Sequence, residues 1–310
     1  MANNLTARVR DRTLLHLAGH TATRPQKEST MRSRYPQSLA MLTVLLAALV
    51  TSAAAQAPVS ATTARIQELS YQFEGAPWSS VVYENVAVEM EYQMYVPTTY
   101  DGSTAYPLMV LLHGLGSNPG GVIRYQGLTD LAEERGYIVA APMGYNSRGW
   151  YGSRGTSRAS NRGDDANDPA NLGDLSELDV MNVLAMTLEG YNIDRDRIYL
   201  AGHSMGGGGT WHLGIKYPDI WAGLGPVAPA IYTSPDALSA ITHIPVIIIQ
   251  GDEDRLVNVD IARRWVAQME ELGMTHQYVE IPGGDHSRII ARDPDNVKAI
   301  FDFFDQQRKN

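Results

Sequence analysis

Five short, wholly apolar runs recur between residues 108 and 249, and they constrain the fold more than any other feature. They cover residues 108–112, 137–141, 198–201, 224–227 and 245–249, and the last two include Gly or Pro. Continuous apolar runs of this length suit strands that are buried on both faces of a sheet. Segments with helical periodicity separate several of these runs. This alternation predicts an α/β protein in which helices cover both faces of a mostly parallel sheet.

The segments between and before these runs complete the predicted architecture. Residues 86–96 alternate apolar and polar side chains, which indicates a half-exposed antiparallel strand ahead of the parallel ones. Helices are predicted over 175–188, 261–272 and 297–304. Ser176 with Asp179 predicts a capping box for the first of these helices, and Asp260 is the expected N-cap of the second.

The first 55 residues have the pattern of an export signal rather than of a folded domain. Arg32 and Arg34 precede an apolar run over 39–50, and small residues follow up to Ala55. A basic region, a short apolar region and small residues predict a secretory signal peptide over 31–55, with cleavage after Ala55. The alternative is an uncleaved membrane anchor, although the run is shorter than the 20 or so apolar residues of a spanning helix. Residues 1–30 are interpreted as an over-extended start before Met31, and a secreted or periplasmic location follows.

The remaining chain reads as a lead-in over 56–82 and one catalytic domain over 83–310. Residues 1–55 hold seven basic and two acidic residues, so their removal changes the formal charge from −9 to −14, with 18 basic and 32 acidic residues left. An acidic chain without a basic stripe does not favour nucleic acid or an anionic membrane as partner, and a neutral substrate fits better than a polyanion. The chain has no cysteine, which excludes a thiol nucleophile, a disulfide framework and Cys-ligated metal centres.

Ser204 occupies the centre of the chain's G-x-S-x-G sequence, Gly202-His203-Ser204-Met205-Gly206. An apolar strand precedes it, and residues 207–217 can form a helix directly after it. The order strand, sharp turn, helix is that of a nucleophile elbow, which lifts the serine to the carboxyl edge of the sheet. The alternative is a glycine-rich turn with an idle serine.

A serine hydroxyl needs a base and an acid, and this topology supplies them in the order Ser, acid, His. Asp254 follows the run at 245–249 and is the predicted acid, with Asp252 as the second choice. His286 lies in a Gly-rich loop after the strand predicted over 277–281, and is the predicted base. His276 and His243 precede their strands, which places them at the wrong edge of the sheet.

Two backbone N–H groups are predicted to form the oxyanion hole. One belongs to Met205, directly after the nucleophile, and the other to Leu115, in the Gly-rich loop that follows residues 108–112. His113 at the start of this loop is expected to support it rather than to act as a base.

The long irregular stretch over 144–174 is expected to border the site. Trp150 and Tyr151 are the candidate substrate contacts there, and His203 beside the nucleophile is a third; packing inside the protein is the alternative role for each. The oxygen-rich cluster at Asp164, Asp165, Asn167 and Asp168 lacks the spacing of a Ca²⁺ loop, so neither a metal nor a cofactor is predicted.

Three segments besides the nucleophile elbow support a resemblance to a known family. They are residues 113–116, residues 192–211 and residues 216–223. Over about residues 83–306 the chain resembles an α/β-hydrolase, and within that superfamily it resembles secreted esterases of the feruloyl-esterase and polyhydroxybutyrate-depolymerase-like group. The resemblance implies cofactor-free hydrolysis of short-chain or hydroxycinnamoyl esters, either as small molecules or on a polymer, by Ser204, Asp254 and His286. A polyester depolymerase, a prolyl-oligopeptidase-like peptidase and a non-catalytic binding protein on the same scaffold are the alternatives.

Overall fold

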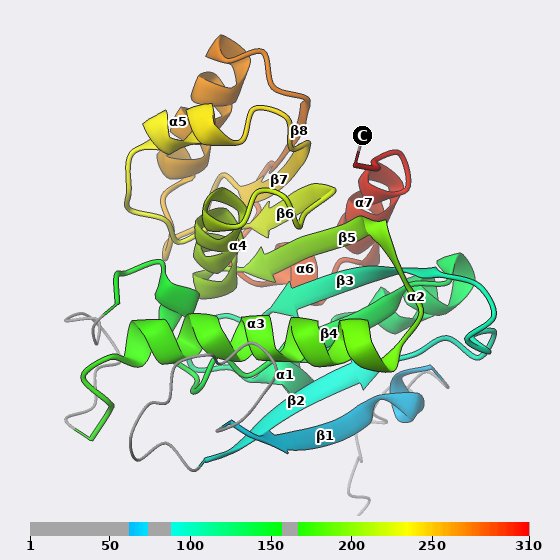
Figure 1. The fold of residues 1–310 in the computed structure, drawn as a ribbon. Helices are drawn as coiled ribbons and strands as arrows, with labels where there is room; N and C mark the ends of the chain where they lie inside the picture. Colours follow the sequence, from blue (N-terminus) through cyan, green and yellow to red (C-terminus); the bar gives the residue numbers. More distant parts are fainter. Residues whose placement is uncertain (1–61, 74–87, 157–166, 310) are drawn as a thin grey trace, which may run out of the picture. The chain divides into compact units, whose positions relative to one another are not determined.

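The computed structural model describes residues 62–73, 88–156 and 167–309, and the predicted signal segment over 31–55 lies outside these residues. The described chain forms an eight-stranded sheet in the order β1-β2-β4-β3-β5-β6-β7-β8 (Figure 1). The strands are β1 (Gln67–Gln72), β2 (Glu89–Tyr95), β3 (Tyr106–Leu112), β4 (Ile138–Pro142), β5 (Ile193–His203), β6 (Gly223–Val227), β7 (Val246–Gly251) and β8 (His276–Ile281). Strand β2 pairs antiparallel with β1 and β4, and the pairs from β4 to β8 are parallel.

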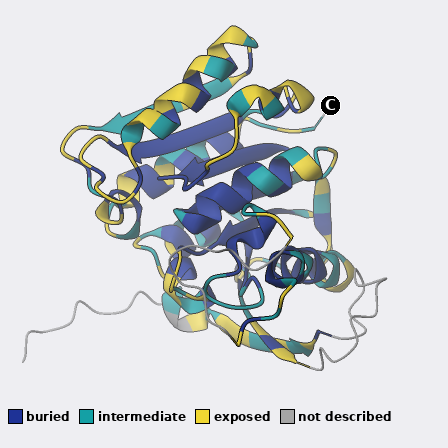
Figure 2. Ribbon diagram, turned by 90° about the vertical axis from the view of Figure 1, so that its left-hand side faces the viewer, coloured by how far each residue is buried: buried dark blue, intermediate teal, exposed yellow. Residues whose placement is uncertain are grey.

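Helices cover both faces of this sheet, as predicted. Figure 1 shows α3 (Leu172–Gly190), α4 (Met205–Lys216) and α5 (Val259–Glu271) on one face. On the other face lie α1 (Pro119–Ile123), α2 (Leu128–Arg135), α6 (Arg288–Ala291) and α7 (Pro294–Phe304). The short 3₁₀ segments are η1 (Thr63–Arg65), η2 (Trp150–Gly152) and η3 (Pro235–Ala240). Each face has its own apolar core, and Figure 2 shows buried strands between helices whose outer sides are exposed.

The apolar runs become central strands because both of their faces are covered. All residues of β4, β6 and β7 are buried, and only Tyr106 of β3 is not. Burial of wholly apolar strands is the largest favourable contribution to folding such a sheet. The predicted mostly parallel sheet, with helices on both faces and an antiparallel strand near its start, is therefore confirmed.

The sequence analysis missed one strand and placed the starts of three helices two or three residues too late. Strand β1 lies within the segment interpreted as a lead-in, and it pairs with β2 along its whole length. Helix α3 begins at Leu172, so Ser176 and Asp179 lie inside it and are buried, and they do not form the predicted capping box. In α5, Asn258 rather than Asp260 is the N-cap, and its side chain accepts the N–H of Asp260 at 2.8 Å. These two helices, and also α7, begin before the apolar pattern that was used to place them.

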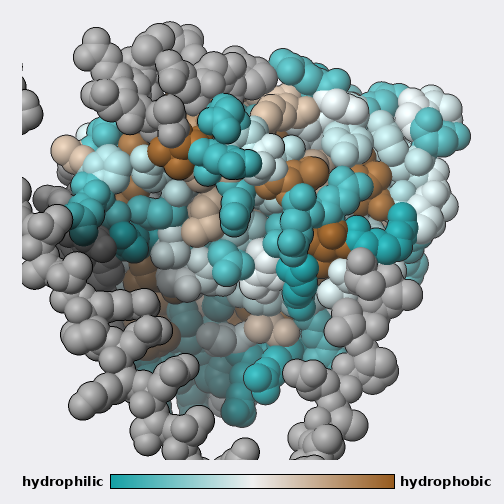
Figure 3. Space-filling model, turned by 90° about the horizontal axis from the view of Figure 1, so that it is seen from below, coloured by the Kyte–Doolittle hydropathy of each residue, from teal (hydrophilic) through white to brown (hydrophobic). Residues whose placement is uncertain are grey.

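The surface carries both hydrophobic and hydrophilic side chains on the face that Figure 3 shows. Among the described residues visible in Figure 3, hydrophobic side chains occur in small separate groups between hydrophilic ones. Within residues 62–73, 88–156 and 167–309, no helix is both long and apolar enough to span a bilayer.

A buried carboxylate fixes helix α3 against α4. Glu177 of α3 accepts a hydrogen bond from His212 Nε2 at its Oε2, at 2.7 Å. Its Oε1 accepts the hydroxyl of Tyr217 at 2.6 Å and lies 2.6 Å from Lys216 Nζ. Burial alone would raise the pKa of Glu177, but the hydrogen bonds from His212, Lys216 and Tyr217 lower it to about 2. The ionised form of Glu177 therefore stabilises the packing of the two helices.

We expect Glu177→Gln to lower the free energy of unfolding at pH 7 by about 1–3 kcal/mol, because buried donors lose a charged acceptor. A lowered pKa in the folded state means that this stabilisation is fully present above the ordinary pKa of 4.5 and is lost as the pH falls toward about 2. Urea unfolding at pH 7, 5 and 3 measures the difference between parent and variant. Glu189→Gln, at an exposed position of the same helix, is the matched control and should be neutral. A difference that stays constant down to pH 3 would contradict this account.

Candidate functional site

Ser204 lies in a strained turn between β5 and α4. Its φ is 59° and its ψ is −114°, a left-handed backbone conformation that non-glycine residues rarely adopt. The turn is held on both sides, because the N–H of Ser204 donates to Val227 O at 2.9 Å and its carbonyl accepts the N–H of Ala230 at 2.9 Å. The strand, sharp turn and helix predicted for G-x-S-x-G are thus present.

The flanking glycines make this turn possible because backbone passes where a side chain would lie. A Cβ at Gly206 would come within 2.3 Å of Leu112 O, and one at Gly202 would come within 2.4 Å of Gly206 O. Both contacts are to backbone atoms, which cannot move aside without shifting a strand. The sequence pattern G-x-S-x-G therefore has a steric cause in this structure.

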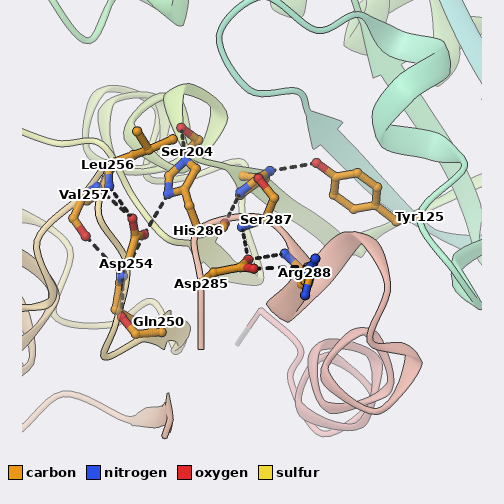
Figure 4. Close-up of polar contacts among 12 residues, drawn as sticks. Tyr125, Ser204, Gln250, Asp254, Leu256, Val257, Asp285, His286, Ser287 and Arg288 are labelled. Atoms are coloured by element: carbon orange, nitrogen blue, oxygen red, sulfur yellow. Dashed lines mark hydrogen bonds and ion pairs between the residues drawn. The ribbon is translucent and has the colours of Figure 1, made fainter. Parts of the chain in front are cut away.

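The structure brings Ser204, His286 and Asp254 together at the carboxyl ends of β5, β8 and β7 (Figure 4). Ser204 Oγ lies 2.8 Å from His286 Nε2, and His286 Nδ1 lies 2.7 Å from Asp254 Oδ2. His286 and Asp254 are both buried, and the side chain of His286 is 10% exposed. This linear arrangement allows proton transfer from the serine hydroxyl to an imidazole oriented by a carboxylate.

Hydrogen bonds keep Asp254 ionised next to the imidazole. Its Oδ1 accepts the backbone N–H groups of Leu256 at 2.8 Å and Val257 at 2.9 Å, and its Oδ2 also accepts Gln250 Nε2 at 3.0 Å. Burial alone would raise the pKa of Asp254, but the hydrogen bonds from His286, Val257 and Leu256 hold it below its ordinary value. An ionised carboxylate at this position can orient the His286 ring through Nδ1.

The second-choice residues lie elsewhere. Asp252 is exposed, and it accepts the backbone N–H of Gly283 at 2.6 Å, which links the loops after β7 and β8. His276 begins β8 at the end opposite His286, and His243 is exposed ahead of β7.

Both segments that are predicted to supply oxyanion donors adjoin the nucleophile. Met205 is the first residue of α4, where backbone N–H groups have no partner inside the helix. The loop after β3 approaches Ser204 so closely that a Cβ on Gly114 would lie 3.5 Å from Ser204 Cβ. The N–H of Gly116 donates to Ser147 O at 2.8 Å, which holds the loop that contains Leu115. His113 is buried and its Nε2 lies 2.8 Å from Met143 O, consistent with a supporting position.

A buried carboxylate anchors the segment after β4, in which the Met143 carbonyl oxygen contacts His113. Asp179 of α3 accepts the N–H of Gly144 at 2.6 Å and the hydroxyl of Tyr71 from β1. Burial raises the pKa of Asp179 to about 6 in spite of these donors. The strand that the sequence analysis missed is thereby connected to the loop beneath the candidate oxyanion site.

All three candidate substrate contacts are buried in this structure, and the first two are packed by residues distant in the sequence. Tyr151 has no exposed surface, because its ring packs where a Cβ on Gly209 would otherwise lie, and His113 N donates to its hydroxyl at 3.0 Å. Trp150 is 6% exposed, and the Arg154 guanidinium lies 4.3 Å from its ring centroid. Arg154 also lies 4.1 Å from the ring of Tyr232, which is 56% exposed. Tyr232 was not identified from the sequence, because no motif marks the segment after β6.

The third candidate contact, His203, links the nucleophile turn to the base. Its Nε2 lies 2.8 Å from the carbonyl oxygen of His286, and its Nδ1 lies 2.7 Å from Tyr125 Oη. Burial, with a smaller effect from His286, lowers the pKa of His203 to about 4, so the ring is neutral near pH 7. A neutral ring has one N–H, and the carbonyl partner requires that Nε2 carries it. His203 therefore donates to His286 and accepts from Tyr125.

Asp168 of the predicted acidic cluster has a structural partner. Its carboxylate forms an ion pair with Arg148, at 2.6 Å from Nε and 2.7 Å from Nη2. Asp164 and Asp165 lie outside the described residues.

Comparison with known families shows which family the chain belongs to. Residues 84–289 match the family described as "Putative esterase". The chain belongs to the Esterase family. Among curated relatives, "Feruloyl esterase D" of Neurospora crassa is 29% identical over 133 residues, which are 39% of this chain and 39% of that protein. "Poly(3-hydroxybutyrate) depolymerase" of Ralstonia pickettii is 32% identical over 140 residues, 42% of this chain and 26% of that protein. The chain thus spans less than half the length of these curated relatives.

Solved structures of esterases share the fold of this family member. A crystal structure of a thermostable esterase aligns with a TM-score of 0.58 at 21% identity, and the alignment covers 80% of this chain and 64% of that one. A feruloyl esterase module from Clostridium thermocellum, complexed with sinapinate, aligns with a TM-score of 0.55 at 17% identity over 77% of this chain and 88% of that one. At these identities the similarity supports the α/β-hydrolase fold alone.

The turn at Ser204 yields a prediction about the family motif. We expect Gly206→Ala to lower the free energy of unfolding by more than about 3 kcal/mol, because the added methyl group meets backbone at 2.3 Å. Gly190→Ala, at the end of α3, is the control, since no atom lies within 4 Å of its added methyl group. Urea denaturation of both variants checks this, and equal stabilities would show that the turn relaxes freely.

Proposed function

We propose that this esterase-family chain hydrolyses carboxylic esters with Ser204 as nucleophile, His286 as base and Asp254 as the acid that orients the base. The observation that supports this most directly is the hydrogen-bonded series from Ser204 Oγ through His286 to Asp254, at 2.8 and 2.7 Å. The strained backbone of Ser204 adds support, because a conformation of this kind is retained where it serves a function.

The proposed reaction has two steps. His286 Nε2 takes the proton of Ser204 as Oγ attacks the ester carbonyl, and the N–H groups of Met205 and Leu115 stabilise the oxyanion, each by about 3 kcal/mol. The protonated His286 then donates to the departing alkoxide, which leaves an acyl group on Ser204. Water, deprotonated by His286, hydrolyses the acyl-enzyme and restores the serine. Every proton in this sequence passes through one imidazole nitrogen.

We propose short-chain or hydroxycinnamoyl esters as substrates, on small molecules or on polymers. The exposed ring of Tyr232 beside Arg154 offers an aromatic surface near the nucleophile, since Ala230, two residues earlier, is hydrogen bonded to Ser204. Polyester cleavage is a second candidate, supported by the 32% identity with the hydroxybutyrate depolymerase. Secretion, through a signal peptide over 31–55, remains part of this proposal.

Removal of the hydroxyl tests the proposed nucleophile. We expect Ser204→Ala to reduce kcat for p-nitrophenyl acetate by at least about 10³-fold, while the unfolding midpoint in urea stays close to that of the parent. A fluorophosphonate should label Ser204 covalently in the parent and not in the variant, as mass spectrometry can measure. Ser239→Ala, in exposed η3, is the control. Unlabelled parent protein without turnover of p-nitrophenyl esters, methyl ferulate or a peptide anilide would favour the non-catalytic alternative.

The contact between His203 and the base leads to a second kinetic prediction. His203→Phe keeps an aromatic ring but removes the donor to the His286 carbonyl, so we expect kcat to fall about tenfold with little change in KM. Tyr125→Phe removes only the outer hydrogen bond and should have a smaller effect in the same direction. Steady-state kinetics with p-nitrophenyl acetate measure both. A change confined to KM would instead indicate that His203 contacts substrate.

A further inference from the structure

A cleft of about 650 Å³ opens beside His286, between the loop after β7 and the loop that joins β8 to α6. His286 itself lines it, together with Leu256, whose side chain is 66% exposed. Three arginines also line the cleft: Arg255 from the first loop, Arg288 from α6, and Arg292 directly after α6. Arg255 thus lies on the loop of the candidate acid, whereas Arg288 and Arg292 lie in and directly after the helix that follows the candidate base.

The charge of this cleft differs from that of the chain as a whole. The chain has a formal charge of −9, yet three arginines and two carboxylates, Glu253 and Asp285, line the cleft. Asp285 already accepts the backbone N–H groups of Ser287 and Arg288, at 2.9 and 2.7 Å, and its other oxygen lies 3.5 Å from Arg288 Nε (Figure 4).

The other two arginines have no such partner. Within the described ranges of the chain, the side chains of Arg255 and Arg292 make no hydrogen bond or ion pair, and both are exposed. Two guanidinium groups that form no ion pair within those ranges thus line one cleft, Arg255 on the loop after β7 and Arg292 directly after α6, and Glu253 lines the same cleft.

The proposed mechanism determines which part of an ester would reach these arginines. His286 must protonate the departing alkoxide, so the alcohol portion leaves from the side of the imidazole. The proposed oxyanion donors lie on other elements, the loop after β3 and the start of α4. A cleft lined by His286 is therefore suited to the alcohol portion of the substrate rather than to the carbonyl oxygen.

We propose that this cleft binds the alcohol portion of esters in which that alcohol carries a carboxylate, as in acyl esters of hydroxy acids. Arg255 and Arg292 bind the carboxylate, and Leu256 contacts the carbon chain between it and the ester. Guanidinium groups suit this role because they are charged at any working pH and bind carboxylates through paired N–H groups. Hydrolysis breaks the acyl C–O bond and adds water, so the products are a carboxylic acid and a free hydroxy acid. This inference rests on the proposed ester hydrolysis and names a substrate class for it.

A matched pair of esters tests the inference. At pH 7.5, 4-acetoxybutanoate carries a carboxylate, whereas 4-acetoxybutanamide has the same length and no charge. We expect kcat/KM, measured by acetate release, to be about tenfold higher for the carboxylate at low salt, and the preference to decrease in 0.5 M NaCl. An equal or lower value for the carboxylate would overturn the inference.

Variants assign the preference to residues. Arg255→Gln and Arg292→Gln should each lower the carboxylate-to-amide ratio by about threefold, and the double variant should abolish the preference. Arg264→Gln, at an exposed position of α5 outside the cleft, should leave the ratio unchanged. A preference that survives in the double variant would show that other groups bind the carboxylate. Turnover of p-nitrophenyl acetate is the separate test of ester hydrolysis, so its loss would refute the proposed function rather than the assignment of this cleft.

Discussion

The site depends on one backbone constraint, the left-handed conformation of Ser204 between a buried strand and a helix. That conformation persists because the surrounding backbone leaves no alternative. Strand β3 passes within 2.3 Å of the place where a Gly206 side chain would lie, and the main chain of Ser204 is hydrogen bonded to Val227 and Ala230. The hydroxyl consequently stands at the carboxyl edge of the sheet, where the loops after β3, β7 and β8 also converge.

Buried polar contacts then fix those loops relative to the turn. Asp179 connects β1 to the segment that holds His113, and Glu177 fixes α3 to the helix that begins after Ser204. His203 connects the turn directly to the backbone of His286. Each of these groups is costly to bury alone and is therefore hydrogen bonded to partners from different elements. Such contacts hold the loops at the edge of a rigid sheet with the positional accuracy that proton transfer requires.

A feature could be predicted from the sequence where one short segment of the chain determines it. Apolar runs identify central strands because burial on both faces acts on every residue of the run, and β3, β4, β6 and β7 were found for that reason. Ser204 was selected by its motif, and Asp254 and His286 by their positions after predicted strands. The structure has the three within hydrogen-bonding distance in series, and their catalytic roles are proposals. Strand β1 was not predicted because it is a largely exposed edge strand in which apolar and polar side chains alternate only weakly.

Contacts between distant segments carried no local signal. The burial of Tyr151 depends on the absence of a side chain at Gly209, 58 residues later in the chain, and on the backbone of His113. The role of His203 depends on Tyr125 and on a carbonyl of the loop after β8. In the same way, an overall acidic composition gave no indication that Arg255 and Arg292 would line one cleft.

The division of the site into two sides follows from the order of the strands. Strand β5 carries the nucleophile at the middle of the sheet, with β3 next to it on one side and β6, β7 and β8 in succession on the other. The loop after β3 is hydrogen bonded and closely packed, as a donor site for a developing negative charge requires. The loops after β7 and β8 lie on the other side, where β6 separates β7 from β5 and β8 is the edge strand. In the proposed reaction, recognition of the alcohol portion can therefore vary through residues such as Arg255 and Leu256 without changing the turn at Ser204, the proposed donors or the contact between His286 and Ser204.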